Sequence, residues 1–150
     1  MIELPEDFQD LLVELHDAGA AFVVVGGYAV AFHGHPRATK DIDILVHATP
    51  ENASKVYQAL AAFGAPLSSF QVTEADFATY EGILQISLPP RRIDVLNRAT
   101  GITFAEAIAD GDSFKVEGKA IPIIGRHALI KRAAGRAQDI ADIKVLERIG

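Results

Sequence analysis

The sequence contains no cysteine and no long apolar run. Without cysteine there can be no disulfide scaffold, thiolate zinc site, iron–sulfur cluster or cysteine nucleophile. The longest apolar stretch, Ala18 to Val25, is interrupted by Gly19 and is far shorter than the roughly 18–20 residues that a membrane-spanning helix needs. The amino terminus, MIELPEDFQD, is acidic and lacks the basic region of a signal peptide. We therefore expect a cytoplasmic protein that does not act in a membrane.

Three widespread motifs are also missing. The chain contains no Gly-x-Ser-x-Gly, no Walker-type phosphate loop and no Gly-x-Gly-x-x-Gly. Serine hydrolases, P-loop NTPases and Rossmann dehydrogenases are therefore disfavoured. His33 and His35 lie close together on a predicted loop, but the other histidines are dispersed, so the five histidines do not form a metal-binding set.

Positive charge is scarce in the first part of the chain. Residues 1–90 contain three basic and twelve acidic side chains, for a net charge of −9, whereas residues 91–150 contain eleven basic and eight acidic side chains, for a net charge of +3. The formal charge of the whole chain is −6, which argues against a uniformly basic nucleic-acid-binding surface. The basic excess after residue 90 either forms solvated helix faces or provides a local anion-binding surface.

The length and composition are those of one globular domain. The chain has 150 residues, of which 49% are hydrophobic and 23% charged, and this is enough to bury one hydrophobic core. No internal repeat, low-complexity tract or long linker divides it. We expect a single domain over residues 1–150.

Hydrophobic periodicity and turn residues predict an alternation of helices and strands. Strands are predicted at 21–25, 39–47, 83–88 and 92–96, and a hairpin at 113–124 around Glu117-Gly118. Helices are predicted from Pro5 to Gly19, at 28–33, from Thr49 to Gly64, at 103–110 and over the C-terminal residues, with an interruption at Gly135. Residues 65–81 are expected to form a loop with one short helical turn. This order predicts an α+β (α/β-like) fold, with a central mixed β-sheet flanked by helices and a helical C-terminus.

Two acids interrupt one of the predicted buried strands. Asp41 and Asp43 are two residues apart, so both project from the same side of the strand, while Ile42, Ile44 and Val46 face the other side. Neighbouring carboxylates in an apolar setting repel each other unless a cation lies beside them. A hard divalent ion, Mg²⁺ above all, suits such oxygen ligands. The alternative is that Asp41 only pairs with Arg37 or Lys40 at the entry to the strand.

A glycine pair and a later acid extend this pattern. Gly26-Gly27 follows the preceding strand and opens a short helix, a geometry that lets the backbone approach a phosphate closely. Asp94 again lies in an apolar strand context, next to arginines. Three carboxylates on neighbouring strands, a glycine turn and nearby arginines are the groups that two-metal phosphoryl or nucleotidyl transfer requires. Asp94 could also act as a general base toward an acceptor hydroxyl.

These residues resemble the signature of the DNA polymerase β-type nucleotidyltransferase superfamily. The resemblance rests on Gly26-Gly27, the interval of thirteen residues from 28 to 40, Asp41-Ile42-Asp43-Ile44 and the later Asp94. The longer pattern around Gly26, together with the C-terminal run from Leu129 to Ile143, is similar to small prokaryotic members related to the AbiEii- and MenT-like toxin nucleotidyltransferases. The resemblance covers about Ala21 to Leu146.

The resemblance implies a role for each matching position. Asp41, Asp43 and Asp94 would be the catalytic acids and the ligands of a two-metal Mg²⁺ site, with Mn²⁺ as an alternative ion. The nucleotide, for example ATP, would be bound by Gly26, Gly27, Arg37, Thr39 and Lys131. Asp139 and Asp142 share a helix face, where an ion pair is at least as good an explanation as catalysis. The glycine pair lacks the serine that many members use to bind a phosphate oxygen.

The predicted activity is transfer of a nucleoside monophosphate from an NTP to a hydroxyl acceptor. The acceptor could be an RNA or tRNA 3′ end, a protein or a small molecule, and the resemblance adds a role in a toxin–antitoxin or defence system with a cognate partner. The main alternative is a non-catalytic nucleotide- or RNA-binding module with the same fold. A second alternative is an antitoxin-like partner protein, whose surface would carry an exposed apolar patch.

Overall fold

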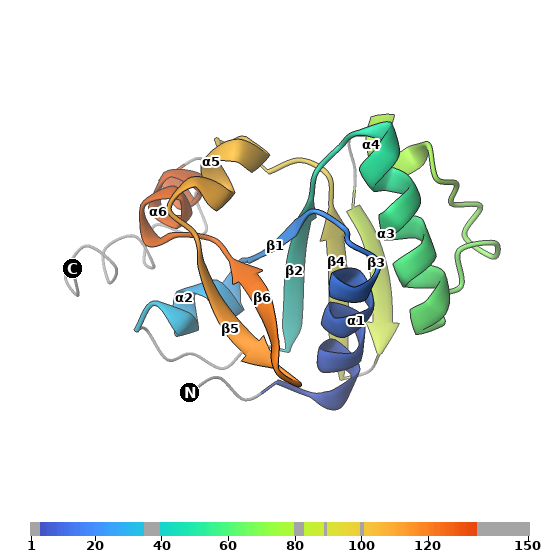
Figure 1. The fold of residues 1–150 in the computed structure, drawn as a ribbon, viewed down its shortest axis with the longest axis horizontal. Coiled ribbons are helices and arrows are strands. Elements are labelled where there is room, and N and C mark those ends of the chain that lie inside the picture. The colour runs from blue at the N-terminus through green and yellow to red at the C-terminus, as the bar shows by residue number, and fades with distance from the viewer. Residues whose placement is uncertain (1–3, 35–39, 80–82, 89, 100, 135–150) are drawn as a thin grey trace.

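The computed structural model of the chain describes residues 4–34, 40–79, 83–88, 90–99 and 101–134. Within these residues, six strands form one mixed sheet in the order β3-β4-β2-β1-β6-β5 (Figure 1). The strands are β1 (Phe22–Val25), β2 (Asp41–Val46), β3 (Ile83–Leu88), β4 (Arg91–Leu96), β5 (Asp112–Val116) and β6 (Lys119–Ile123). The helices are α1 (Glu6–Asp17), α2 (Gly27–Phe32), α3 (Pro50–Phe63), α4 (Asp76–Thr79), α5 (Phe104–Ala109) and α6 (Arg126–Ala134). The expected α+β fold with a central mixed sheet is confirmed.

The helix ends lie where the turn residues predict them. Thr49 caps α3 by accepting a hydrogen bond from the Asn52 N–H at 3.2 Å, and Pro50 occupies the first turn. The helix stops at Gly64, whose φ of +101° is the left-handed conformation that glycine adopts without strain. The β5–β6 hairpin turns at Glu117 and Gly118, which both have positive φ, +50° and +78°. This is the backbone that a two-residue type I′ turn requires.

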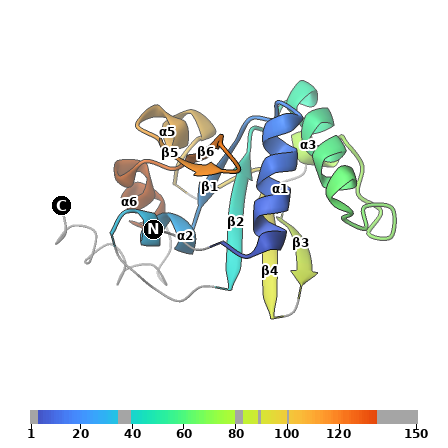
Figure 2. The ribbon, with the colours of Figure 1, turned by 60° about the horizontal axis from the view of Figure 1, so that its bottom comes forward.

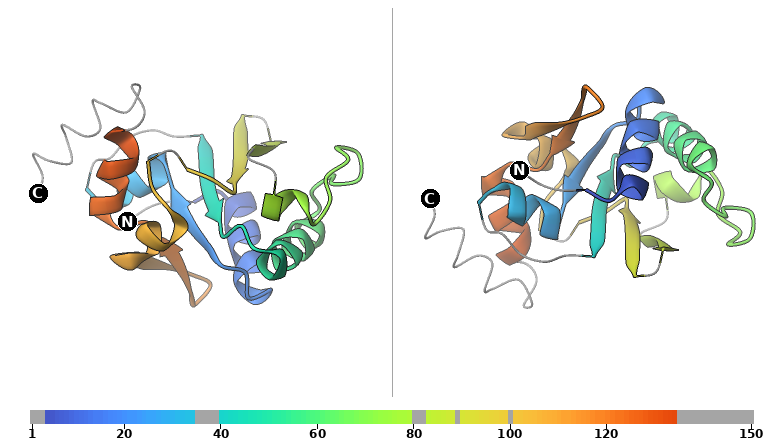
Figure 3. Two further views of the ribbon diagram at one scale, coloured as in Figure 1. Left: turned by 90° about the horizontal axis from the view of Figure 1, so that it is seen from above. Right: turned by 90° about the horizontal axis from the view of Figure 1, so that it is seen from below.

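Helices α1 and α3 pack together over one face of the sheet, as Figures 2 and 3 show from three directions. Strand alternation directs Ile42 and Ile44 of β2 and Ile93 of β4 into this layer, where all three are fully buried. The helices supply the matching apolar surface, namely Phe8, Leu11, Leu12 and Leu15 of α1 and Val56 and Leu60 of α3. The residues that alternate with the buried isoleucines, and that include the predicted acids, therefore project from the opposite face.

The strand directions bring several chain segments to one edge of the sheet. β1 runs antiparallel to β2 with Val25 opposite Asp43, and β2 runs parallel to β4. β6 runs parallel to β1 with Ile123 beside Val24. The carboxyl ends of β1 and β6 therefore lie at the same edge as the amino-terminal halves of β2 and β4. This is the edge at which Gly26 follows β1.

Asn52 fixes the opposite ends of β1 and β2. Its side-chain oxygen accepts from the Ala21 N–H at 2.6 Å, and its amide donates to the carbonyls of Ala21 and His47, both at 2.9 Å. The side chain is buried, so these bonds satisfy backbone groups that water cannot reach. Helix α3 and two central strands are thereby joined by one residue.

Within the described ranges, no helix is long and apolar enough to cross a membrane. The expectation of a single domain over residues 1–150 stays a prediction.

Candidate functional site

The three predicted acids lie on adjacent strands and on one face of the sheet. Asp43 of β2 is paired in register with Asp94 of β4, and Asp41 is paired with Arg92. Because each strand alternates its faces, these four side chains form a square on the face opposite α1 and α3. Asp94 is buried, whereas Asp41 and Asp43 are partly exposed. The expectation that Asp41 and Asp43 share a side is confirmed, but the structure does not bury them as the apolar strand pattern suggests.

Gly26 lies directly against the Asp43 carboxylate. Its φ is +74°, and a Cβ built on it would overlap Asp43 Oδ2 and come within 2.9 Å of Asp43 Cγ. A side chain at this position would require the Asp43 carboxylate to shift. The glycine turn and the carboxylate pair are therefore parts of one site, as the sequence spacing predicts.

Arg92 links two of the acids. Its Nε donates to Asp94 Oδ1 at 2.9 Å and its Nη2 donates to Asp94 Oδ2 at 3.1 Å, which is a bidentate pair. The same Nη2 lies 3.1 Å from Asp41 Oδ2. The hydrogen bonding of Arg92 to Asp94, in which Arg92 donates, raises the pKa of Arg92 above its ordinary value, and the negative charges of Asp94 and Asp41 add to this. The alternative that Asp41 is an ion-pair residue is thus supported by a partner on β4, Arg92. Pairing of Asp41 with Arg37 stays a prediction, because Arg37 lies outside the described residues.

A divalent cation fits the chemistry of this donor set. Within the described part of the chain, no three acidic or histidine side chains converge closely enough to form a ready-made metal site. The three carboxylates nevertheless share one face, and a guanidinium already lies between Asp41 and Asp94. The net charge of the three acids and Arg92 is −2, which a hard cation with oxygen ligands would balance.

Lys131 lies on α6 and pairs with Glu106 of α5. Glu106 also completes a capping box with Thr103, because each side chain bonds the backbone N–H of the other residue. The hydrogen bond from Lys131 is the largest of the causes that hold the pKa of Glu106 below its ordinary value. About half of the Lys131 side chain is exposed, so its ammonium group is accessible to a ligand but is already paired.

A cavity of about 670 Å³ lies beside Glu106. It is lined by Leu45, Asn97, Arg98, Phe104 and Glu106, among others. Leu45 is two residues beyond Asp43 on β2 and therefore faces the same side of the sheet. Phe104 stacks on His47 with a centroid separation of 4.8 Å. The cavity therefore extends along the acid-bearing face, away from the glycine turn.

Sequence reasoning did not single out Arg92, which lies at this site, or Arg126, which lies at the end of the sheet where Gly26 follows β1. The signal for Arg92 was available, since Arg92-Ile93-Asp94 places both charges on one strand face. Arg126 begins α6, two residues after Ile124, whose N–H donates to the Val24 carbonyl at the edge where Gly26 lies. Its Nε and Nη2 atoms are buried and have no hydrogen-bond partner among the described residues. No local pattern in the sequence singles it out.

The remaining predicted residues are placed elsewhere or not described. Arg37 and Thr39 lie outside the described residues, as do His35, Asp139 and Asp142. Gly27 is the first residue of α2. His33 makes a 2.7 Å hydrogen bond between its Nε2 and the Ile124 carbonyl, which joins the end of α2 to the segment before α6.

Comparison with known proteins finds similarity in structure alone. No family model and no curated protein matches the sequence. The structure is similar to that of LnuA, a lincosamide antibiotic adenylyltransferase bound to lincomycin, with a TM-score of 0.61, 18% identity and 98% of each chain covered. It is also similar to a proposed nucleotidyltransferase from Thermotoga maritima (TM-score 0.58, 16% identity, 94% of this chain and 88% of that chain). An antigenic nucleotidyltransferase-like protein from Paracoccidioides brasiliensis is similar over 98% of this chain and 78% of that chain (TM-score 0.56, 16% identity).

These neighbours show that the chain has the fold of nucleotidyltransferases. The fold named in the sequence analysis is therefore confirmed, whereas the narrower likeness to the AbiEii- and MenT-like toxins stays a prediction.

Proposed function

We propose that this protein is a metal-dependent nucleotidyltransferase that moves a nucleoside monophosphate from an NTP to a hydroxyl acceptor. The observation on which this rests is the in-register pair of Asp43 and Asp94 on parallel strands, with Gly26 packed against Asp43. The nucleotidyltransferase fold supports the proposal, because the fold provides an NTP-binding framework and the acids supply the chemistry that such a framework needs.

The acids would hold Mg²⁺, or Mn²⁺ in its place, through Asp41, Asp43 and Asp94. The bound cations would neutralise the triphosphate and the departing pyrophosphate and would lower the pKa of the acceptor hydroxyl. In the transfer, the acceptor oxygen forms a bond to the α-phosphorus, and the bond from that phosphorus to pyrophosphate breaks. Asp94 is the residue that we expect to accept the hydroxyl proton.

The rest of the NTP would lie across the same face. The Gly26-Gly27 backbone contacts the triphosphate, because no side chain at residue 26 keeps it away. The Lys131 ammonium group would leave Glu106 and bind a phosphate of the NTP. Arg37 and Thr39, in the segment before β2, would make further contacts with the nucleotide. The nucleoside would enter the cavity lined by Leu45 and Phe104, where a base can pack against apolar surface.

The acceptor of the nucleoside monophosphate would belong to one of three classes of hydroxyl compound. LnuA acts on an antibiotic and is matched over nearly its full length, so a small hydroxyl compound is the first class to test. The sequence pattern of the toxin nucleotidyltransferases supports a second class, the 3′ end of RNA or tRNA, and a protein hydroxyl is the third. A cytoplasmic toxin–antitoxin or defence role with a cognate partner belongs to this same part of the proposal.

The proposal is tested by following labelled nucleotide. The protein is incubated with each α-³²P-labelled NTP, Mg²⁺ and a fractionated cell extract, next to variants D43N and D94N. We expect label on one acceptor class with the wild-type protein and a loss of at least about 100-fold with either variant, because these acids act on the transferred phosphate. D10N is the matched control, since Asp10 is an exposed acid on α1, which covers the other face of the sheet.

Two outcomes would contradict the proposal. Equal labelling by D43N and the wild-type protein would remove the acids from the reaction. Tight Mg²⁺-dependent NTP binding without transfer to any fraction would instead favour the non-catalytic nucleotide-binding module.

A further inference from the structure

Arg92 occupies the place of a cation between two of the proposed metal ligands. Its guanidinium bonds both oxygens of Asp94 and also lies 3.1 Å from Asp41 Oδ2. Asp94 is 6% exposed, and a carboxylate so deeply buried is strongly stabilised in its ionised form by a positive partner. Among the residues that the structure describes, Arg92 is therefore an internal cation of the site before any metal binds.

The register of the sheet produces this arrangement. Arg92 and Asp94 alternate onto one face of β4, and parallel pairing with β2 sets Asp41 beside Arg92 and Asp43 beside Asp94. Asp41, Asp43 and Asp94 cannot all turn toward one metal ion while the guanidinium separates Asp41 from Asp94. This accounts for the absence, among the described residues, of a preformed group of three ligands.

We propose that Arg92 is an internal counter-cation that competes with the divalent metal, so that metal binding displaces its guanidinium from Asp41 and Asp94. The inference rests on the proposed function, because it takes these acids as the metal ligands. The Arg92 side chain is 43% exposed, so it can rotate into solvent without disturbing the core. Before metal binds, Arg92 keeps three neighbouring carboxylates from repelling one another. In this role Arg92 is a positioning residue, and it sets how tightly the metal binds.

Competition between Arg92 and the metal predicts the direction in which the metal affinity changes when Arg92 is replaced. Replacing Arg92 by the uncharged methionine removes the positive charge that lies between Asp41 and Asp94, so R92M should bind Mn²⁺ more tightly than the wild-type protein by about tenfold or more. Without metal, R92M should unfold at a lower temperature, because Asp94 is then buried without a partner. Added Mn²⁺ should raise the Tm of R92M more than that of the wild-type protein. If Arg92 instead supported the metal site, the affinity would fall.

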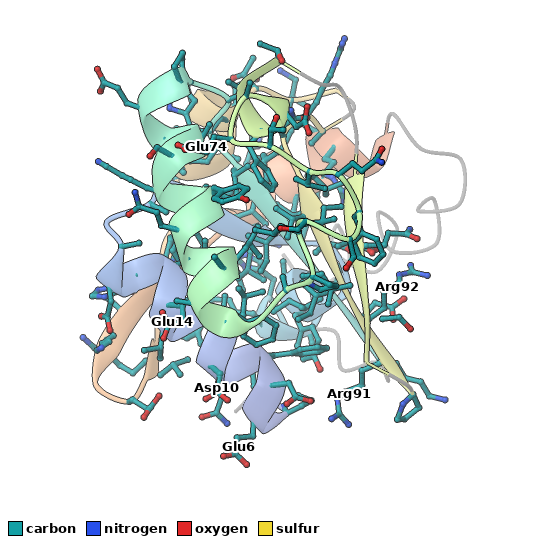
Figure 4. All side chains as sticks on the ribbon, turned by 90° about the vertical axis from the view of Figure 1, so that its right-hand side faces the viewer. Glu6, Asp10, Glu14, Glu74, Arg91 and Arg92 are labelled. Carbon is teal, nitrogen blue, oxygen red and sulfur yellow. The ribbon has the colours of Figure 1, made fainter. Side chains whose placement is uncertain are left out.

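Arg91 supplies the matched control. It is the preceding residue on β4 and faces the helix layer, where its Nη2 bonds Asp7 Oδ2 at 3.0 Å. Figure 4 shows Arg91 near the end of α1 and Arg92 on the other side of the strands. R91M removes the same charge from the same strand, so any general charge effect would appear in both variants. We expect R91M to bind Mn²⁺ with the wild-type affinity.

The experiment measures Mn²⁺ binding without nucleotide, by calorimetry and by the electron paramagnetic resonance signal of free Mn²⁺, for the wild-type protein, R92M, R92K, R91M and D43N. R92K keeps the charge but loses the bidentate bond, so its affinity should lie between those of R92M and the wild-type protein. This variant tests the inference even if R92M does not fold. R92M or R92K affinity equal to or weaker than wild type, while D43N binds poorly, would overturn the inference and leave the proposed function intact. Wild-type Mn²⁺ affinity in D43N would overturn the metal site itself.

Discussion

At the scale of single residues, Gly26 determines where the Asp43 carboxylate can lie. G26A should cost more than about 1 kcal/mol of folding free energy, because a Cβ at φ +74° is strained and would also overlap Asp43. Nucleotide transfer should fall by at least about 100-fold, because Asp43 must move to make room. Denaturant unfolding and the transfer assay measure the two effects separately.

A substitution at Gly19 distinguishes the effect of backbone strain from the effect of the contact with Asp43. Its φ is +72°, nearly that of Gly26, but a Cβ there would meet nothing within 4 Å. G19A should therefore lose about 1 kcal/mol of stability and keep full activity. If G26A and G19A lost activity equally, the contact between Gly26 and Asp43 would have no catalytic meaning.

Arg126 offers a second prediction at this scale. Its buried Nε and Nη2 atoms lack partners within the described ranges, and unpaired buried donors cost free energy that an apolar side chain does not. R126M should therefore leave the Tm unchanged or raise it. It should weaken NTP binding by about tenfold, because Arg126 lies at the edge that Gly26 shares and would meet the anionic phosphates.

Calorimetric NTP titration and thermal unfolding of R126M measure both quantities. A lower Tm with unchanged NTP affinity would show that Arg126 only supports the fold.

At the scale of elements, the ion pair of Glu106 with Lys131 joins α5 to α6. Glutamine also forms a capping box, so E106Q keeps the Thr103 cap while it removes the charge that pairs with Lys131. The ion pair is solvent-exposed, so its loss should change stability little. If Lys131 binds the triphosphate, E106Q should tighten NTP binding by about two- to fivefold and K131M should weaken it by more.

The same titration decides between two interpretations of Lys131. Weaker binding in K131M together with tighter binding in E106Q supports the predicted phosphate contact. Unchanged affinity in both variants would make Lys131 a structural link between α5 and α6.

The elements themselves could be predicted from the sequence because their signals are local. Thr49-Pro50 at the start of α3 and Gly64 at its end act within one helical turn, and the runs of β-branched residues mark the buried strands. The spacing of Asp41 and Asp43 is also a local signal, because side chains two residues apart on a strand lie on the same face. Asp94 was singled out by another local signal, an acid within an apolar strand.

What could not be predicted depends on strand pairing. The contact of Arg92 with Asp41 exists because β2 and β4 are neighbours in a particular parallel register, and nothing within either strand specifies that register. The same holds for Arg126, which lies at the same end of the sheet as Gly26 because β6 runs parallel to β1. The pairing of Lys131 with Glu106 is also a tertiary fact. Sequence patterns therefore did not single out Arg92 or Arg126, and they did not predict that Lys131 is paired with Glu106.

At the scale of the whole molecule, acidic side chains lie on both faces of the sheet. Helix α1 alone contributes Glu6, Asp10 and Glu14 to the outer surface of the helix layer, as Figure 4 shows, and the formal charge of the chain is −6. Nonspecific RNA binding depends on many cationic contacts to phosphates. Without a divalent cation, the protein should therefore not retain RNA in a mobility-shift assay at about 150 mM salt.

Magnesium should change this result only through the acid-bearing face. Bound cations reverse the local field of Asp41, Asp43 and Asp94, so any RNA retention that appears with Mg²⁺ should disappear in D43N. D10N should behave as the wild-type protein does, since it changes charge on the helix layer. RNA binding in EDTA that weakens steeply with salt would instead place the interface on the basic residues after position 90. In that case the chain, despite its net charge of −6, would have a local cationic surface that binds RNA without a metal ion.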